Sequence, residues 1–279
     1  MEIQSVIFII AGLVLLTLSG NFLVKGAVSI AKYLKVSSLV IGATVVSMGT
    51  SAPELIVSVK AVWNEASSIS LGNVIGSNIS NIALVLGLTA IIFPVTVMKS
   101  GIKWDWLVMM ASTILFMIFL YSGNTLEMWE GIVFVVLLCA YIFNSIYRSR
   151  KSQTDNSEES VKVKWGVSLQ DIINLFKTSQ TVLPISLAIF AIIVSTVGLY
   201  FGAEFLIDGS VTIARNFGVS ERIIAVSIIA LGTSVPELAT SVTAAFKRVM
   251  EISIGNIIGS NIFNILGILG ITSILKSIE

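Results

Sequence analysis

Long apolar stretches, separated by short polar segments, follow one another along almost the whole chain. Each is long enough to cross a hydrocarbon core of about 30 Å as an α-helix. Because backbone polar groups in lipid must pair within their own segment, an isolated stretch of this length predicts a helix. The stretches lie at residues 5–30, 39–63, 69–96, 104–121, 128–147, 182–207, 223–246 and 252–275. We therefore expect an all-α integral membrane protein with about eight spans.

Composition supports the same class of protein. Charged residues make up only 12% of the chain and the mean hydropathy is +0.96, whereas soluble domains carry about 25% charged residues. The first apolar stretch has no basic residues before it and no small-residue cleavage pattern after it, so we expect a retained helix rather than a signal peptide.

The apolar stretches fall into two groups on either side of a polar segment. Residues 1–147 carry five of them and form the first half, and residues 181–279 carry three and form the second half. The segment 148–180 begins with charged and hydroxyl residues, which predicts a solvated linker. Around 169–176 it mixes apolar and polar positions, a pattern that suits a short helix on the membrane surface.

Lysine and arginine are unevenly distributed between the loops on the two sides of the expected bundle. Basic residues collect in the cytoplasmic loops of membrane proteins, and this bias sets their orientation. One side holds Lys32, Lys35, Lys99, Lys103, Arg148, Arg150, Lys151, Lys162, Lys164, Lys177, Lys247 and Arg248, and the other holds Arg215, Arg222 and Lys276. We therefore expect a multi-pass protein of the cell membrane with its N-terminus outside and the linker in the cytoplasm.

Two polar motifs in the first half return in the second half at a constant offset of 183 residues. Gly49–Glu54 (GTSAPE) returns as Gly232–Glu237 (GTSVPE), and Gly72–Asn81 returns as Gly255–Asn264. Five spans separate the starts of the two repeats. Since five is odd, equivalent segments enter the bilayer from opposite sides. This predicts an inverted-topology duplication, an arrangement typical of secondary transporters.

The first motif combines a helix break with a carboxylate. Pro53 and Pro236 lack the backbone N–H that would pair with the carbonyl four residues earlier, so each helix should open at that point. A charged group at the bilayer centre costs about 2.5–3.5 kcal/mol or more, and Glu54 and Glu237 would also repel each other. A single motif could be a simple Ser/Thr-Pro kink. Two copies that both end in Glu favour a cation site.

The residue types limit which cation such a site could bind. The chain has no His and only one Cys, Cys139, so the ligands must be oxygens. Ca²⁺ takes about 6–8 oxygen ligands. In the second motif, Ser77 and Asn81 lie four residues apart on one helical face, as do Ser260 and Asn264, and we expect both pairs to face the site.

Other polar residues leave alternatives open. The asparagines at 73, 78, 256 and 261 could line the site or could join neighbouring helices by hydrogen bonds. Charged residues toward the ends of spans should anchor the helices at the membrane surface, namely Lys25, Lys60, Glu204 and Asp208.

The paired GTSxPE and GNxxGSN motifs resemble the α-repeats of the sodium/calcium exchanger family, within the cation/calcium antiporters. The resemblance implies an antiporter rather than an enzyme, which exchanges Na⁺ for Ca²⁺ by alternating access and uses no cofactor beyond these ions. It also implies that the helices at 5–30 and 182–207 form a long tilted pair that moves during transport.

The resemblance further implies a set of metal ligands. Glu54 and Glu237 would be the central ligands, Thr50 and Thr233 would offer backbone oxygens to Ca²⁺, and Asn81 and Asn264 would line the middle position. The flanking Na⁺ positions would use Ser51, Ser260 and the Ser47 carbonyl on one side, and Ser77, Ser234 and the Ala230 carbonyl on the other.

The sequence departs from the family pattern in two ways. Many members carry Asp where this chain has Asn264, and members usually have ten helices. The second departure means that the chain is a fragment or that the last two helices are dispensable. Alternatives are therefore an H⁺-coupled Ca²⁺/cation antiporter, a non-transporting membrane scaffold or truncated subunit, and a channel. The sequence also leaves open K⁺ as a co-transported ion.

Overall fold

The computed structural model describes residues 2–65, 67–93, 99–123, 125–154, 182–219 and 232–278. These residues are nearly all helical, and their β pairing is limited to an isolated bridge between Leu126 and Ile278. Six helices are long and apolar enough to cross a membrane, or seven if a bent pair counts as one span. The all-α fold and seven of the expected spans are therefore confirmed. The remaining span, 223–246, lies partly outside the described residues.

In the first half, the helices are α1 (Glu2–Leu34), α2 (Ser38–Ile41), the π-helical η1 (Gly42–Val46), α3 (Ser47–Thr50), α4 (Ala52–Trp63), α5 (Ser67–Ser80), the π-helical η2 (Asn81–Leu86), α6 (Gly87–Ile92), α7 (Lys99–Gly123) and α8 (Met128–Thr154). In the second half, they are α10 (Ile185–Asn216), α13 (Val235–Phe246), α14 (Met250–Ile262), the π-helical η4 (Phe263–Leu269) and α15 (Gly270–Leu275). The helix α8 thus includes residues 148–154 of the expected linker. The expected surface helix near 169–176 lies outside the described residues.

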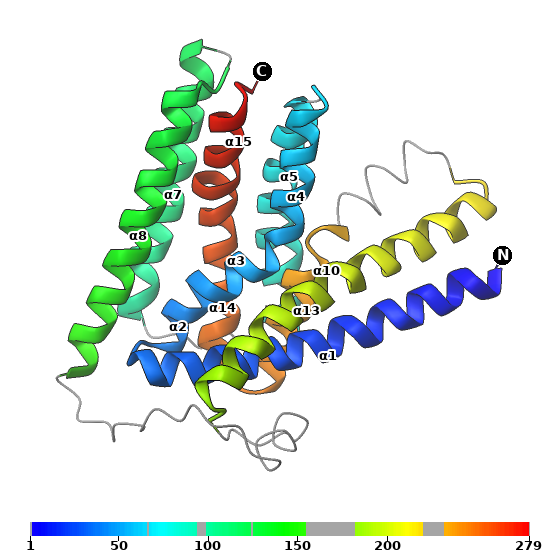
Figure 1. Cartoon of the computed structure of the whole chain (residues 1–279), viewed down its shortest axis with the longest axis horizontal. Coiled ribbons are helices and arrows are strands. Elements are labelled where there is room, and N and C mark those ends of the chain that lie inside the picture. The colour runs from blue at the N-terminus through cyan, green and yellow to red at the C-terminus, as the bar shows by residue number, and fades with distance from the viewer. Residues whose placement is uncertain are drawn as a thin grey trace.

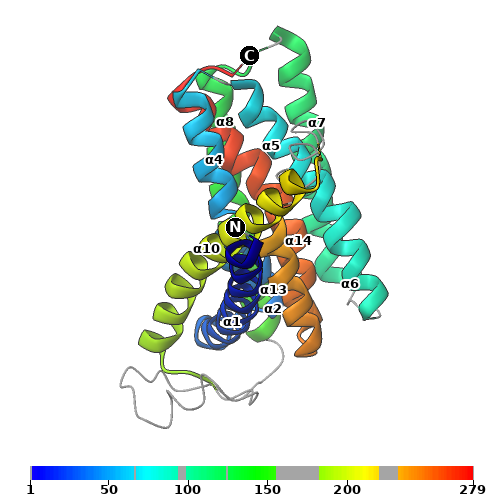
Figure 2. The same cartoon turned by 90° about the vertical axis from the view of Figure 1, so that its right-hand side faces the viewer.

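Helices α1 and α10 form a long antiparallel pair that crosses the other helices at a steep angle (Figures 1 and 2). With 33 and 32 residues, each is about 50 Å long at 1.5 Å per residue, so each must tilt to fit a 30 Å hydrocarbon core. Glycines bring the two backbones together: a Cβ atom on Gly12 would lie 2.8 Å from the carbonyl oxygen of Gly202.

The remaining helices form an upright bundle around α14, η4 and α15, the most enclosed of the candidate spans (Figure 1). Helices α7 and α8 cover one side of it, where Phe134, Leu138 and Ile268 belong to one apolar cluster. The contact is close at Gly131, where a Cβ atom would lie 2.7 Å from the carbonyl oxygen of Gly270. A second apolar cluster lies along α1 and α10.

Backbone features recur at the offset of the sequence repeat. A positive φ occurs at Lys35 (54°) and Gly218 (75°), and again at Glu65 (61°) and Arg248 (59°). The helix break has φ −87° and ψ 10° at Ser51, and φ −84° and ψ 1° at Ser234. A π-helical segment follows the second motif in both halves. The two halves therefore share one backbone plan, and the opposite directions of α1 and α10 agree with inverted topology.

Candidate functional site

The first helix break lies at Ser51, between α3 and α4. The segments before and after it are bent by 46°, and Pro53 lies in the first turn of α4, where its missing N–H cannot pair with the carbonyl of Gly49. The Ser51 N–H still donates to the Ser47 carbonyl at 2.9 Å. The expected opening of this helix is confirmed. The second break has the same conformation at Ser234, and the residues directly before Gly232 lie outside the described part.

Each break places a glutamate in the first turn of the following helix. Glu54 begins α4 and Glu237 begins α13, and both side chains are fully buried. The exposed N–H groups of a helix N-terminus favour negative charge. Because both helices start at a break inside the bundle, these favourable ends lie in the interior of the protein rather than at its surface.

The two repeats meet at Glu237. Its Oε1 accepts hydrogen bonds from the hydroxyl of Ser51 at 2.7 Å and from that of Ser260 at 3.5 Å. Ser51 belongs to the first repeat, whereas Ser260 and Glu237 belong to the second. Glu54 lies within electrostatic range of Glu237. The carboxylates that the sequence placed 183 residues apart therefore share one buried region.

Several buried oxygens of the two repeated motifs accept no hydrogen bond from the described residues. They are both carboxylate oxygens of Glu54, Oε2 of Glu237, Oδ1 of Asn81 and of Asn264, and the hydroxyl oxygens of Ser77 and Ser234. A buried polar atom without a partner costs about 1–3 kcal/mol. Carboxylate, amide and hydroxyl oxygens are the ligands that a hard cation prefers, and these buried atoms are of the same kinds.

The sequence left open whether four asparagines line the site or join neighbouring helices, and their hydrogen bonds show which partners they have. Asn73 donates to the Ser58 hydroxyl at 2.9 Å and to the Glu54 carbonyl at 3.1 Å. In the second repeat, Asn256 donates to Ser241 at 3.2 Å, the equivalent of the Asn73–Ser58 bond. Asn256 also accepts from the Thr50 hydroxyl at 3.0 Å. Both side chains therefore join the helices on which the glutamates lie to α5 and α14.

The other two asparagines also make hydrogen bonds. Asn78 donates to the carbonyl of Asn261 at 3.5 Å and accepts from Asn264 at 3.0 Å. Asn261 donates to the carbonyl of Ile257 one turn earlier, at 2.8 Å. Their repetition at the 183-residue offset suggested a shared role, but their partners differ: the side chain of Asn78 joins α5 to α14 and η4, whereas the side-chain amide of Asn261 bonds within α14.

The remaining candidates differ in how well the structure places them. Ser47 is fully buried, but its carbonyl already accepts from Ser51 N–H and, at 3.3 Å, from the Thr50 hydroxyl. Thr233 is half-buried, and Ala230 lies outside the described residues. Within the described part of the chain, Ser51 and Ser260 are hydrogen-bonded to Glu237, whereas the side chains of Ser77, Asn81 and Ser234 are bonded to neither glutamate.

The expected surface anchors agree with the structure at three of four positions. Lys60, Glu204 and Asp208 are exposed, as expected for groups at the ends of spans. The expectation is wrong for Lys25, whose side chain is 8% exposed. Lys25 lies on α1, which packs against α10 and α13, an arrangement that the sequence does not reveal.

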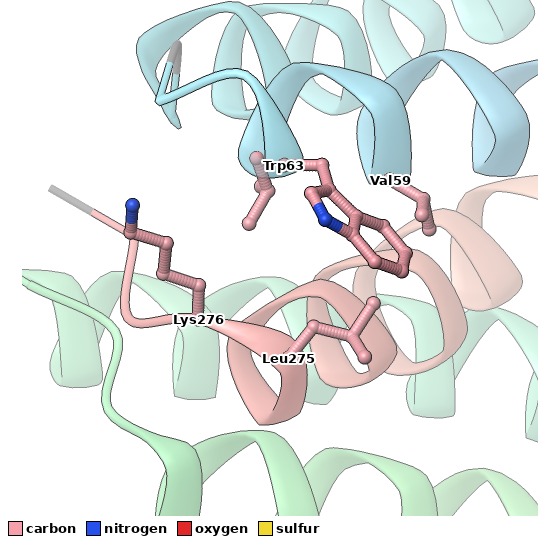
Figure 3. Close-up of a pocket in the computed structure, with 5 residues that line it drawn as sticks. Val59, Trp63, Leu275 and Lys276 are labelled. Atoms are coloured by element: carbon pink, nitrogen blue, oxygen red, sulfur yellow. The ribbon is translucent and has the colours of Figure 1, made fainter.

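A separate cavity of about 320 Å³ lies at the ends of α4 and α15, near the surface. Val59, Val62, Trp63, Leu275 and Lys276 line it. The indole of Trp63 points from α4 across the gap toward Leu275 (Figure 3), and Lys276 forms an ion pair with Glu65 at 3.2 Å. None of the candidate ligands lines this cavity, so it is distinct from the buried site.

Solved structures resemble this fold over its full length. A structure of the sodium-calcium exchanger NCX_Mj, soaked with zero Na⁺ and Ca²⁺, superposes with a TM-score of 0.80 and 32% sequence identity. The match covers 100% of this chain and 84% of that chain.

Named relatives are similar over nearly the same length. The putative antiporter CaxA of Alkalimonas amylolytica is 37% identical over 269 residues, which cover 96% of this chain and 80% of CaxA. The sodium/calcium exchanger MaX1 of Methanosarcina acetivorans is 33% identical over 290 residues, covering 96% of this chain and 82% of MaX1. The model of the family described as sodium/calcium exchanger protein matches residues 4–147 and 187–279. With most of its length matched, including both breaks and both glutamates, this chain belongs to the sodium/calcium exchanger family.

Proposed function

We propose that this protein is a secondary active antiporter that exchanges Na⁺ for Ca²⁺ across the membrane by alternating access. The observation that carries the proposal is the buried pair Glu54 and Glu237, contributed by two inverted repeats whose motifs also hold buried neutral oxygens that accept no hydrogen bond from the described residues. Buried carboxylates in a membrane protein need a compensating charge. One Ca²⁺ balances both, and Na⁺ ions balance them in a different number, which is the physical basis for exchange.

The proposed ligands follow from the family resemblance and are supported by burial. Glu54 and Glu237 hold Ca²⁺ together with backbone oxygens of Thr50 and Thr233. Asn81 and Asn264 line the middle position, and their buried Oδ1 atoms accept no hydrogen bond from the described residues. Two flanking Na⁺ positions complete the set, the first with Ser51, Ser260 and the Ser47 carbonyl, the second with Ser77, Ser234 and the Ala230 carbonyl.

Alternating access in this proposal is a movement of the α1–α10 pair across the bundle. The two long helices pack closely through glycines, so they can move as a unit, while the glutamates stay on the bundle. We place the N-terminus outside, the linker 148–180 in the cytoplasm between the halves 1–147 and 181–279, and the protein in the cell membrane. The bias of lysine and arginine supports this orientation.

The carboxylate count bears on the coupling. Asn264 is a neutral amide that donates to Asn78, so the site carries two carboxylates and a charge of −2 before ions bind. A proton-coupled exchanger would have to protonate one of these groups in each cycle. Na⁺ coupling requires no such step, and it agrees with the name of the relative MaX1.

Flux measurements in proteoliposomes test the proposal. Purified protein should take up Ca²⁺ when Na⁺ is loaded inside and diluted outside, and uptake should stop when the Na⁺ gradient is collapsed. Uptake that follows a pH gradient and ignores Na⁺ would favour the proton-coupled alternative. A flux that does not respond to ions on the opposite side would indicate a channel, and the absence of any Ca²⁺ flux would favour a scaffold.

A further inference from the structure

The two halves differ in how the long helices contact the helices that bear the glutamates. Helix α1 packs along α13, whereas its repeat equivalent α10 makes few contacts with α4, the equivalent of α13. Ala239, Thr243 and Lys247 follow one face of α13 and its C-terminal end, and all three are half-buried. Their equivalents on α4 are exposed, namely Ile56, Lys60 and Asn64. The contact is therefore closed at one end of the molecule and open at the other.

The closed contact is tight at Gly20 of α1. A Cβ atom there would lie 3.1 Å from the hydroxyl oxygen of Thr243 and 3.3 Å from the carbonyl oxygen of Ala239. One turn further along α13, the ammonium of Lys247 donates to the backbone carbonyl of Asn21 at 2.9 Å. Lys247 is thus a side chain of the bundle that holds the middle of α1 by a charge-assisted hydrogen bond.

The chemistry of Lys247 suits a bond that is made and broken. Burial, with Lys25 nearby, lowers the pKa of Lys247 to about 8, so the group is mostly charged at pH 7. Its repeat equivalent is Asn64, and the equivalent of Asn21 is Glu204. Within the described residues, no hydrogen bond joins Asn64 to α10. Within the described residues, the bond is therefore present at one end of the molecule and has no equivalent at the other.

A second pair of equivalent positions also differs between the two ends. Phe93 and Phe246 make an edge-to-face contact with ring centroids 4.9 Å apart at the end of α13. Their equivalents, Lys276 and Trp63, line the open cavity at the end of α4 (Figure 3). Neither ring lies on α1, and Phe246 remains largely exposed, so the closed end is identified by the contact of α1 with α13.

We propose that Lys247 is a positioning residue that locks α1 onto α13 at the cytoplasmic end and so favours the outward-facing conformer. This inference rests on the proposed function and orientation, because it assigns the closed end to the cytoplasm and makes release of α1 a step of transport. In the inward-facing conformer, α10 would contact α4, and the neutral amide of Asn64 would replace the ammonium. The outward-facing state is then the more stable one without ions.

Cysteine labelling tests the inference without relying on transport. In a Cys139→Ser background, Thr243→Cys reports on the covered face of α13 and Ile56→Cys reports on the open face of α4. Lys247→Met should speed the reaction of the thiol at position 243 with a membrane-impermeant reagent from the cytoplasmic side by roughly ten- to a hundredfold, the range expected for losing a hydrogen bond to a charged group. It should slow the reaction of the thiol at position 56 from the outside.

Two further variants keep the test decisive. Lys60→Met removes a charge from the exposed face of α4 and should change neither rate, and Lys247→Arg keeps the donor and should retain slow labelling. If Lys247→Met leaves the labelling rate of the Thr243→Cys protein within about twofold of the parent rate, or if Lys60→Met has the same effect as Lys247→Met, the lock is refuted. Labelling reports the conformation directly and does not depend on transport. If the protein failed the Na⁺-gradient test, the proposed function would be refuted, but the labelling rates would still test the lock.

A cross-link addresses the case in which Lys247→Met does not fold. Gly20→Cys with Thr243→Cys places two thiols where the structure already brings these atoms together, so an oxidant should join α1 to α13. Ca²⁺ exchange should then stop and return on reduction. Exchange that continues through the cross-linked protein would show that α1 need not leave α13, and would overturn the inference.

Discussion

At the scale of single residues, the site depends on two carboxylates that form no salt bridge within the described part of the chain. The carboxylate of Glu237 accepts from Ser51 and Ser260, whereas the carboxylate of Glu54 accepts from none of the described residues. In a transporter, carboxylate oxygens without protein partners are useful, because a bound cation supplies the missing partner and the compensating charge. Binding then stabilises the folded state to a degree that rises with the ion concentration.

Replacing either glutamate by glutamine should abolish this stabilisation. Glu54→Gln and Glu237→Gln keep the shape of the side chain but remove half of the charge that balances Ca²⁺. For the parent protein, Ca²⁺ at a hundred times its Kd should add about 2.7 kcal/mol to the free energy of unfolding, visible as a rise in Tm. Both variants should lose this rise and the Ca²⁺ flux.

The control for these variants is Glu204→Gln, at an exposed position on α10. It removes the same charge from the chain and should keep both the thermal shift and the flux. A Glu54→Gln protein that still melts at a higher temperature with Ca²⁺ would contradict the assignment of Glu54 as a ligand.

At the scale of helices, the local sequence predicted where the helices with the GTSxPE motif break but not which hydrogen bonds join them to their neighbours. The bend at Ser51 follows from Pro53, a cause that lies within the same helix. The roles of Asn73 and Asn256 could not be predicted, because an amide in a membrane helix is equally suited to a site and to a neighbouring helix. Which one it contacts depends on packing between segments far apart in the chain.

The asparagine pairs should contribute to stability rather than to ion selectivity. Asn256→Ala removes bonds to Ser241 and Thr50 in a fully buried position, whereas Asn73 is only half-buried. Hydrogen bonds between membrane helices contribute about 0.6–1.7 kcal/mol, so Asn256→Ala should lower the free energy of unfolding by about that amount and Asn73→Ala by less. Unfolding in detergent, without Ca²⁺, measures both, and an equal or reversed order would contradict this view.

The packing of α1 on α10 makes a second prediction about helices. Gly12→Ala places a methyl group 2.8 Å from a backbone oxygen, so the helices must separate, at a cost of about 1–3 kcal/mol. Gly87→Ala meets nothing within 4 Å among the described residues, and alanine favours a helix by up to about 1 kcal/mol over glycine. The two variants should therefore shift Tm in opposite directions, and a stable Gly12→Ala protein would argue against this close contact.

At the scale of the whole molecule, the duplication is what the sequence shows most directly. The repeated motifs predicted an inverted pair of halves, and recurring backbone features, such as the positive φ of Glu65 and Arg248, confirm a shared plan. The asymmetry between the ends could not be predicted. Equivalent positions such as Asn64 and Lys247 do differ in sequence, but the sequence does not show which of them contacts a long helix. Burial of Lys25 and the bond from Lys247 to α1 depend on how α1 packs against α10 and α13, which lie far from it in the sequence.

The most direct test of the central claim is to locate the divalent ion. Crystals soaked in Ca²⁺ or Sr²⁺ should show an anomalous peak between the carboxylates of Glu54 and Glu237, with Ca²⁺ about 2.3–2.6 Å from an oxygen of each. A peak elsewhere, or two carboxylates that face different compartments with no shared ion, would contradict the account.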